Sequence, residues 1–250
     1  MAANSALSAV TLRYWACRGR AEFIRCMLRD SGTAFSDERW TKDRAEDWPE
    51  QKRFVAVAGP FGMLPVLHWG DGSTGDGGNV DGGDEDNEVI VSQTLAIAQF
   101  LQLKLRPKEE QEAVKLTLAM ALGCHVLEEL YLPLLKMLWG QGASPQTYLT
   151  KILPERLLRL DAHLPEGGWL LAGDAPCWAE YLLFDTLQAI GEVFGREAVE
   201  GGAVLRGFLT RMAQRPALRE YLMSDDRAET PITMAPGEAE IRAQISEALR

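Results

Sequence analysis

The sequence predicts an α/β domain followed by a domain made only of helices. Short alternating runs that are typical of strands occur only in the first hundred or so residues. Beyond the proline-containing linker 106–108, apolar residues recur every three or four positions, as they do in amphipathic helices. We therefore expect an α/β domain at 1–105, a helical domain at 109–230 and a carboxyl-terminal extension at 231–250.

A short polar turn separates the first expected strand from the first expected helix. Side chains alternate over 12–15, and apolar residues at helical spacing follow over 21–28. This arrangement places Tyr14 at the carboxyl end of the strand and free backbone N–H groups at the helix start. Ligands of open α/β sheets bind at such carboxyl ends, and helix starts favour anions. The turn adds positive charge through Arg18 and Arg20.

Three further strands are expected, at 35–39, 65–67 and 89–91. The strand at 65–67 begins with Pro65, and an X–Pro bond is where a cis peptide can occur. A helix over 92–101 follows the last strand. Its first turn would hold Gln93 and Thr94, whose amide and hydroxyl groups can meet an anionic ligand.

Apolar periodicity predicts the helices of the second half at 109–139, 149–164, 181–194, 203–213 and from 215. Pro133 is expected to bend or end the first of these helices. A helix-like stretch at 238–249 has no role that the sequence suggests.

Composition excludes several classes of function. The chain has 250 residues, of which 46% are hydrophobic, and this suffices for a sizeable core. No run approaches eighteen apolar residues, and the first ten residues lack the pattern of a signal peptide, so we expect a cytoplasmic protein without a membrane span. The four cysteines lack metal-ligand spacing, which predicts reduced thiols and no metal. The net charge of −10 argues against nucleic acid and membrane partners.

Much of this charge comes from one segment. Residues 70–88 contain seven glycines and seven acidic residues but no basic residue. Such a composition cannot bury enough apolar surface to order itself, so a disordered, solvated insertion is expected. Its acids do not follow the spacing of an EF-hand, which disfavours calcium binding.

Four motifs in order resemble those of cytosolic glutathione transferases, closest to the sigma and mu classes. They are Tyr14-Trp15 with Arg18-Gly19-Arg20-Ala21-Glu22, Trp48-Pro49-Glu50-Gln51-Lys52, Pro60-Phe61-Gly62-Met63-Leu64-Pro65 and Gln93-Thr94-Leu95-Ala96-Ile97. The resemblance implies the glutathione transferase fold, with a thioredoxin-like first domain, and a homodimeric detoxification enzyme that uses glutathione as co-substrate. It also places a helix-capping box at Cys177 and Glu180, where the thiol would be a poorer cap than the usual hydroxyl.

The resemblance assigns roles to individual residues. Tyr14 would be catalytic: its hydroxyl would stabilise the glutathione thiolate, the nucleophilic form of the thiol. Glutathione would be bound by Tyr14, Arg20, Trp48, Lys52, Met63, Leu64, Pro65, Gln93 and Thr94. A hydrophobic electrophile would contact Trp15, Cys17, Met120, Cys124 and Tyr131. Glu128 is the candidate to reach the ligand in the partner subunit's site. A role as a solvated glutamate or as a residue of the dimer interface is an equal alternative.

Three other functions stay open. Cys17 lies near a helix start, where thiols can be acidic, so a thiol transferase that uses Cys17 is one alternative. A sigma-type isomerase or peroxidase, similar to prostaglandin D synthase, is another. The third is a relative that binds glutathione or serves a structural role without catalysis. Neither the second substrate nor the role of the insertion follows from the sequence.

Overall fold

The computed structural model describes residues 10–70, 88–235 and 238–248. Four strands form one mixed sheet in the order β2-β1-β3-β4. Only β1 and β2 run parallel, whereas β3 is antiparallel to both of its neighbours. The strands are β1 (Val10–Trp15), β2 (Ser36–Trp40), β3 (Val66–Trp69) and β4 (Val89–Ser92), close to the four predicted runs. Most of the acidic insertion predicted at 70–88 lies outside the described residues.

The sheet register brings three predicted site segments to one edge. Arg13 of β1 lies opposite Val66 of β3, and Val66 lies opposite Ser92 of β4. The next residue along β1 is Tyr14, and the next along β4 is Gln93. Both therefore lie at the end of the sheet where Pro65 enters β3, after a cis Leu64–Pro65 bond.

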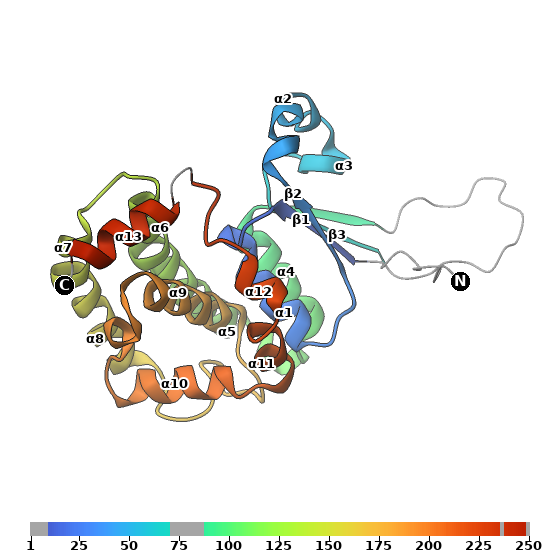
Figure 1. Cartoon of the computed structure of the whole chain (residues 1–250). Coiled ribbons are helices and arrows are strands. Elements are labelled where there is room, and N and C mark those ends of the chain that lie inside the picture. The colour runs from blue at the N-terminus through green and yellow to red at the C-terminus, as the bar shows by residue number, and fades with distance from the viewer. Residues whose placement is uncertain (1–9, 71–87, 236–237, 249–250) are drawn as a thin grey trace, which may run out of the picture.

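Helices of the first half pack beside the sheet or extend beyond it. In Figure 1, α1 and α4 lie on one side of the sheet, and α2 and α3 stand above it. These helices are α1 (Glu22–Asp30), α2 (Trp48–Gln51), α3 (Val55–Ala58) and α4 (Thr94–Leu105), with short 3₁₀ helices at Gly19–Ala21, Lys42–Asp47 and Lys108–Glu110.

The second half is helical, as predicted, and its centre is α9, which is buried along almost its whole length and packs against α1 and α5. The helices are α5 (Ala113–Val126), α6 (Leu132–Leu138), α7 (Pro145–Thr147), α8 (Leu153–His163), α9 (Trp178–Phe194), α10 (Ala203–Ala213), α11 (Pro216–Leu222), α12 (Asp225–Glu229) and α13 (Glu238–Ala248). The predicted fold class, an α/β domain followed by an all-helical domain, is confirmed. The short helix α12 was not predicted.

Pro133 does not end the long helix. Helices α5 and α6 form one continuous helix, Ala113–Leu138, through the π-helical segment Leu127–Tyr131. The wider turn accommodates a proline that lacks an N–H donor, so the helix continues past it. Pro154, at the start of α8, follows a second π-helical segment, Tyr148–Ile152.

Among the described residues, this helix, Ala113–Leu138, is the one that is long and apolar enough to span a membrane. A single such helix is weak evidence for a membrane protein, because the core helices of globular proteins have the same length and composition.

The backbone N–H groups at the start of α9 have more hydrogen-bond acceptors than the sequence predicts. The Glu180 carboxylate accepts the backbone N–H of Cys177 at 2.9 Å and that of Leu170 at 3.0 Å. A third acceptor comes from α4, because Gln102 Oε1 accepts the N–H of Trp178 at 3.1 Å. This side chain compensates for the weak thiol cap and also ties α4 to α9.

Candidate active site at the carboxyl end of the first strand

Tyr14 is the buried phenol at the carboxyl end of β1. Its side chain is 7% exposed and lies on the face of the strand that also buries Val10 and Leu12. The backbone N–H of Arg20 donates a hydrogen bond to Tyr14 Oη at 3.1 Å. The phenol thus accepts one hydrogen bond from the protein, and its own proton remains available for a ligand.

Gly19 makes this arrangement possible. Its φ of +43° lies in the left-handed region, which costs residues with a Cβ atom more than it costs glycine. A Cβ at this position would lie 2.6 Å from Tyr14 Cε1 and 2.7 Å from Tyr14 Oη. The turn therefore requires glycine for its conformation and for the close approach of the tyrosine ring.

The electrostatic environment keeps the phenol neutral. Burial, with a smaller contribution from Cys17, raises the pKa of Tyr14 to about 12, against the opposing effects of the Arg20 backbone and the nearby arginines. At neutral pH the hydroxyl is therefore protonated. A protonated phenol is a hydrogen-bond donor, which is the state needed to stabilise an anion such as a thiolate.

The helix start itself is not open to ligands, and this corrects the sequence prediction of free N–H groups there. The N–H of Arg18 donates to the carbonyl of Pro231 at 2.9 Å, and the N–H of Gly19 donates to the carbonyl of Ile232 at 2.9 Å. The next donor, Arg20 N–H, is bonded to Tyr14. The carboxyl-terminal segment thus occupies the donors that the sequence assigned to an anion.

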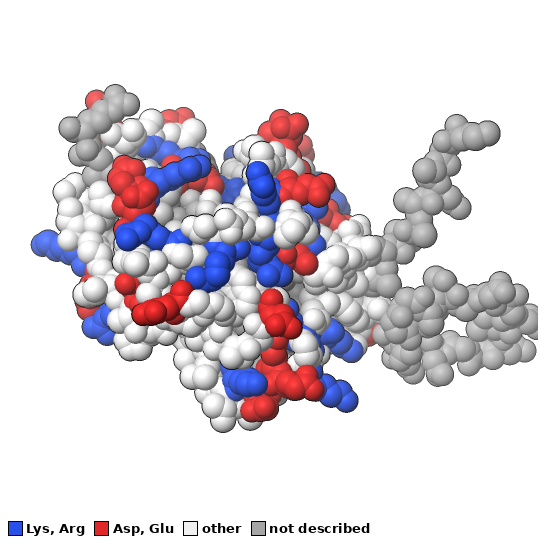
Figure 2. Space-filling view, turned by 90° about the horizontal axis from the view of Figure 1, so that it is seen from below, with Lys and Arg blue, Asp and Glu red and all other residues white. Residues whose placement is uncertain are grey.

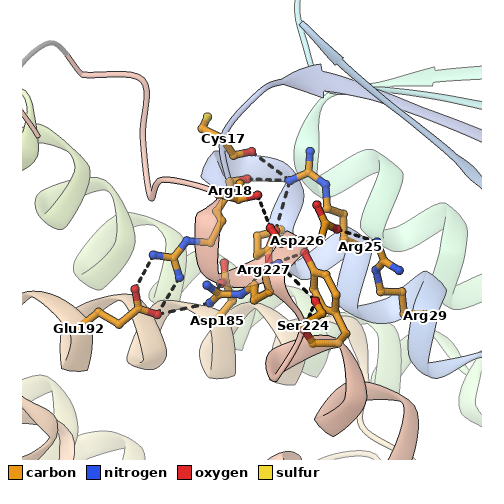
Figure 3. A network of polar contacts seen from close by, with 12 residues as sticks. Cys17, Arg18, Arg25, Arg29, Asp185, Glu192, Ser224, Asp226 and Arg227 are labelled. Carbon is orange, nitrogen blue, oxygen red and sulfur yellow. Dashed lines mark hydrogen bonds and ion pairs between the residues drawn. The ribbon is translucent and has the colours of Figure 1, made fainter. Parts of the chain in front are cut away.

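A network of buried charges fixes this turn to the helical half (Figure 3). The guanidinium of Arg18 contacts both carboxylate oxygens of Glu192, at 2.8 and 2.5 Å. Arg25 Nη1 donates to the carbonyl of Cys17 at 3.0 Å, and Arg227 lies 2.8 Å from Glu22. Elements α1, α9 and α12 are joined by these contacts, so the orientation of the Tyr14 turn depends on residues far away in the sequence.

Asp185 of α9 lies within the same network. Burial, followed by repulsion from Glu22, raises its pKa to about 7, and Arg227, with one amino group 3.8 Å from the carboxylate, opposes this shift. The carboxyl group is therefore partly protonated near neutral pH.

The segment before α4 supplies polar groups at the same edge of the sheet. Gln93 has a φ of +76°, a strained value for a residue that is not glycine, and its side chain is exposed. Its amide lies 3.9 Å from the exposed thioether of Met63. Thr94 is buried as the first residue of α4. A strained backbone at a residue with an exposed amide side chain is typical of binding sites.

Trp48 packs into an aromatic cluster. Its ring centroid lies 5.1 Å from that of Trp15 and 5.5 Å from that of Trp40, both in edge-to-face geometry. The indole is thus held beside Trp15, a predicted wall of the electrophile pocket. Lys52, which follows α2, is exposed, and its ammonium group forms no ion pair with any described residue.

The residues predicted to contact the electrophile are only partly brought together. Cys17 and Tyr131 are buried close to Tyr14. Tyr131 Oη has no hydrogen-bond partner within the part of the chain that the structure describes, and burial raises the pKa of this phenol well above its usual value. Met120 and Cys124 are half-buried on α5, and Glu128 is exposed in the π-helical segment.

Sequence reasoning missed a cavity of about 630 Å³ beside the Tyr14 turn. It lies between the residues that follow β1 and β2 and the carboxyl-terminal segment, and among its lining residues are Ala16, Arg18, Lys42, Met234 and Arg242. The residues predicted to contact the electrophile carry no charge, whereas this cavity carries charges of both signs. Arg242 of α13 donates to the carbonyl of Glu192 at 3.1 Å, so the extension forms part of the wall.

Comparison with known proteins agrees with this geometry. Residues 128–225 match the family described as Glutathione S-transferase, C-terminal domain. Glutathione S-transferase 2 of Onchocerca volvulus is 27% identical over 88% of this chain and 95% of that protein. Glutathione S-transferase P 2 of Bufo bufo is 26% identical over 90% of this chain and 97% of that protein. The solved Pi-class glutathione S-transferase of Onchocerca volvulus superposes with a TM-score of 0.68 and 26% identity, covering 90% of this chain and 97% of that one.

Over most of its length the chain is similar to glutathione S-transferases, and these relatives support a transferase enzyme. Several of its relatives carry P or Pi names, whereas the sequence motifs resemble the sigma and mu classes. A monomeric glutathione S-transferase of Necator americanus shares the fold at 21% identity and a TM-score of 0.61.

Cys17 is a poor candidate nucleophile. Its side chain is buried, and burial raises the pKa of the thiol to about 12, although Arg25 opposes the shift. A thiol with this pKa is protonated at neutral pH, and the protonated form does not attack disulfides.

The described residues also contain no group of three or more His, Cys, Asp or Glu side chains that could hold a metal ion.

Proposed function

We propose that this transferase conjugates the thiolate of glutathione to hydrophobic electrophiles, with the Tyr14 hydroxyl as hydrogen-bond donor to the sulfur. One observation carries the proposal: Tyr14 is a buried, neutral phenol whose oxygen accepts the Arg20 N–H and whose proton has no protein acceptor among the described contacts. A free thiol has a pKa of about 8.5, so at neutral pH a donor of this kind increases the fraction of thiolate.

We assign glutathione to the sheet edge beside Tyr14. The backbone of Leu64 would pair with the cysteinyl part of the ligand, as a neighbouring strand would. The strained Gln93 and the first turn of α4 at Thr94 would bind the γ-glutamyl carboxylate, and Lys52 would be a counter-ion for the glycyl carboxylate. The remaining proposed contacts are Arg20, Trp48, Met63 and Pro65.

The electrophile would bind on the opposite side of Tyr14. Trp15, Cys17, Met120, Cys124 and Tyr131 are the proposed contacts. The unpartnered hydroxyl of Tyr131 favours a second substrate that offers a hydrogen-bond acceptor, because a buried hydroxyl without a partner is costly. A peroxide offers such an acceptor, so this hydroxyl also supports the second candidate function, the sigma-type isomerisation or reduction of a peroxide.

The protein would act in the cytoplasm, in detoxification, as a homodimer. Apolar side chains on the outer face of α5 favour the dimer, because Val114 is 70% and Leu118 is 49% exposed. Exposed Glu128 lies on the same continuous helix and would reach the partner subunit's ligand. A sedimentation measurement decides this point: one species near the 27.7 kDa chain mass would contradict the dimer.

A conjugation assay tests the proposed function. The purified protein should conjugate glutathione to 1-chloro-2,4-dinitrobenzene with saturation in both substrates. Cys17→Ser changes a proposed electrophile contact, so it should alter KM for the electrophile but keep kcat within about twofold. Loss of the activity in Cys17→Ser, in a variant that still folds, would favour the thiol transferase. Absence of conjugation together with turnover of an organic peroxide would favour the sigma-type reaction.

A further inference from the structure

The segment that follows α12 connects the Tyr14 turn to the last helix. In Figure 1, α12 lies beside α1, and the chain then crosses to α13, which packs against α6 and α9. On the way, the carbonyl of Pro231 accepts the N–H of Arg18 at 2.9 Å. The carbonyl of Ile232 accepts the N–H of Gly19, also at 2.9 Å. Two consecutive peptide groups of this segment are therefore bonded to the turn.

The turn is in direct contact with the catalytic phenol. The N–H of Arg20, the residue after Gly19, donates to Tyr14 Oη at 3.1 Å. A Cβ at Gly19 would lie only 2.6 Å from the tyrosine ring, so the backbone and the ring have no space between them. A small shift of Gly19 must therefore move the ring or change the hydrogen bond to its hydroxyl.

Glu238, the first residue of α13, binds the other side of the same two peptide groups. One carboxylate oxygen accepts the N–H of Ile232 at 3.2 Å, and the other accepts the N–H of Thr233 at 2.7 Å. The Ile232 N–H belongs to the same peptide unit as the Pro231 carbonyl, and the Thr233 N–H belongs to the same unit as the Ile232 carbonyl. Each peptide group thus links the carboxylate to the Tyr14 turn.

The surroundings of Glu238 strengthen these bonds. Its side chain is only 9% exposed, and hydrogen bonds to an ionised acceptor are roughly twice as strong as those between neutral groups. A charged end also polarises a chain of hydrogen bonds, which strengthens the next bond along it. Arg242 Nη1 lies 3.8 Å from the carboxylate and lowers the cost of burying its charge. Ile245, which is buried, anchors the same helix.

We propose that Glu238 is a positioning residue for catalysis. Through the two peptide groups it holds Gly19 in the place from which the Arg20 N–H orients the Tyr14 hydroxyl. The inference rests on the proposed function of Tyr14, and Glu238 itself touches neither substrate. It gives the carboxyl-terminal helix a role, for which the sequence suggested none.

The position and the charge of Glu238 have opposite effects on a thiolate at the site. A carboxylate nearby disfavours a second negative charge. Its charge reaches the turn: burial raises the pKa of the Cys17 thiol to about 12, Arg25 opposes the rise, and Glu238 adds to it. If Glu238 acted by its charge alone, removing it would lower the pKa of a bound glutathione thiol. If it positions Tyr14, removing it should raise that pKa.

Three variants of the full chain test the proposal. Glu238→Ala should lower kcat for conjugation at least about fivefold and raise the pKa of the bound glutathione thiol by at least about 0.5 unit. Glu238→Gln keeps one oxygen acceptor and should lie between Glu238→Ala and the wild type.

Glu247→Ala is the matched control, because Glu247 is an exposed glutamate of the same helix. On the face that Figure 2 shows, acidic side chains are interspersed with basic ones, and a single exposed charge in such surroundings has little effect. The control should therefore keep the wild-type kcat and thiol pKa.

Fluorine NMR of the chain labelled with 3-fluorotyrosine reports on Tyr14 without any reaction. The Tyr14 resonance, assigned with Tyr14→Phe, should shift or broaden in Glu238→Ala. The resonance of Tyr181, which donates to Asp30 at another part of α9, should stay unchanged. Circular dichroism shows whether each variant folds, and the nearly isosteric Glu238→Gln gives the same readouts if Glu238→Ala is unfolded.

Two results would overturn the proposal. One is an unchanged Tyr14 resonance in the Glu238 variants. The other is a thiol pKa that stays the same or falls in these variants although Tyr14→Phe raises it. If Tyr14→Phe leaves the thiol pKa unchanged, the proposed function fails, and the fluorine resonance alone decides whether Glu238 positions Tyr14.

Discussion

Replacing Gly19 by alanine should displace Tyr14 and reduce catalysis. The new Cβ would lie 2.6 Å from Tyr14 Cε1, whereas carbon atoms in contact are about 3.5–4.0 Å apart. The ring must therefore move by about 1 Å, which also disturbs the hydrogen bond from Arg20 N–H. Misplacement of a catalytic group by ~1 Å can lower a rate by about 100-fold. We expect kcat for conjugation to fall ~10–100-fold, which corresponds to about 1.4–2.7 kcal/mol.

The same substitution should lower stability for two reasons. Alanine in a left-handed conformation costs roughly 1–2 kcal/mol, and overpacking against the tyrosine ring adds about 1–3 kcal/mol. Gly32 provides a matched control, because its φ is +72° but a Cβ there would meet no atom within 4 Å. Gly32→Ala should therefore lose only the conformational part and keep full activity.

Urea denaturation and steady-state kinetics on both variants separate these effects. Wild-type turnover in Gly19→Ala would refute the reasoning, because it would mean that the position of Tyr14 does not control catalysis. Equal losses of turnover in the two variants would also refute it, because the cause would then be the backbone and not the contact with Tyr14.

Two further predictions concern the buried charge network. The pKa of Asp185 is raised to about 7 in the folded state, so the folded protein binds this proton more tightly than the unfolded chain does. The protonated carboxyl group therefore stabilises the fold at low pH, and this stabilisation is lost as pH rises from about 4 to 7. The unfolding free energy of the wild type minus that of Asp185→Asn should therefore fall by ~2–4 kcal/mol over this range, and a flat difference in urea titrations would contradict the assignment. Glu192→Ala should be more destabilising than Arg18→Gln, because it leaves the buried Arg18 guanidinium without its partner. In Arg18→Gln, by contrast, the carboxylate left without a partner is 35% exposed and can be hydrated. The reverse order of urea midpoints would show that Arg18 is solvated.

Local patterns were sufficient to predict much of this structure. Alternation over 12–15 predicted β1, and apolar periodicity predicted α10 with both of its ends. The strand predicted from Pro65 is β3, which begins one residue later, and the helix predicted from residue 92 is α4, which begins at Thr94. These features are encoded by residues that are close together in the chain.

Contacts between distant residues could not be predicted in this way. Nothing near Arg18 indicates that its N–H is bonded to Pro231, or that its guanidinium pairs with Glu192. Gln102, which caps α9, is likewise an unremarkable polar residue in the sequence of α4. The continuation of the helix past Pro133 depends on a π-helical turn, which has no simple sequence pattern.

The pKa of bound glutathione tests the role of Tyr14 most directly. The thiolate absorbs in the ultraviolet, so its fraction can be measured against pH in the binary complexes of the wild type and of Tyr14→Phe. If the Tyr14 hydroxyl donates to the sulfur, the wild type should lower the thiol pKa by at least ~1 unit from its free value of about 8.5, and Tyr14→Phe should return it towards that value while glutathione still binds. The same lowered pKa in both proteins would contradict the donor role of Tyr14.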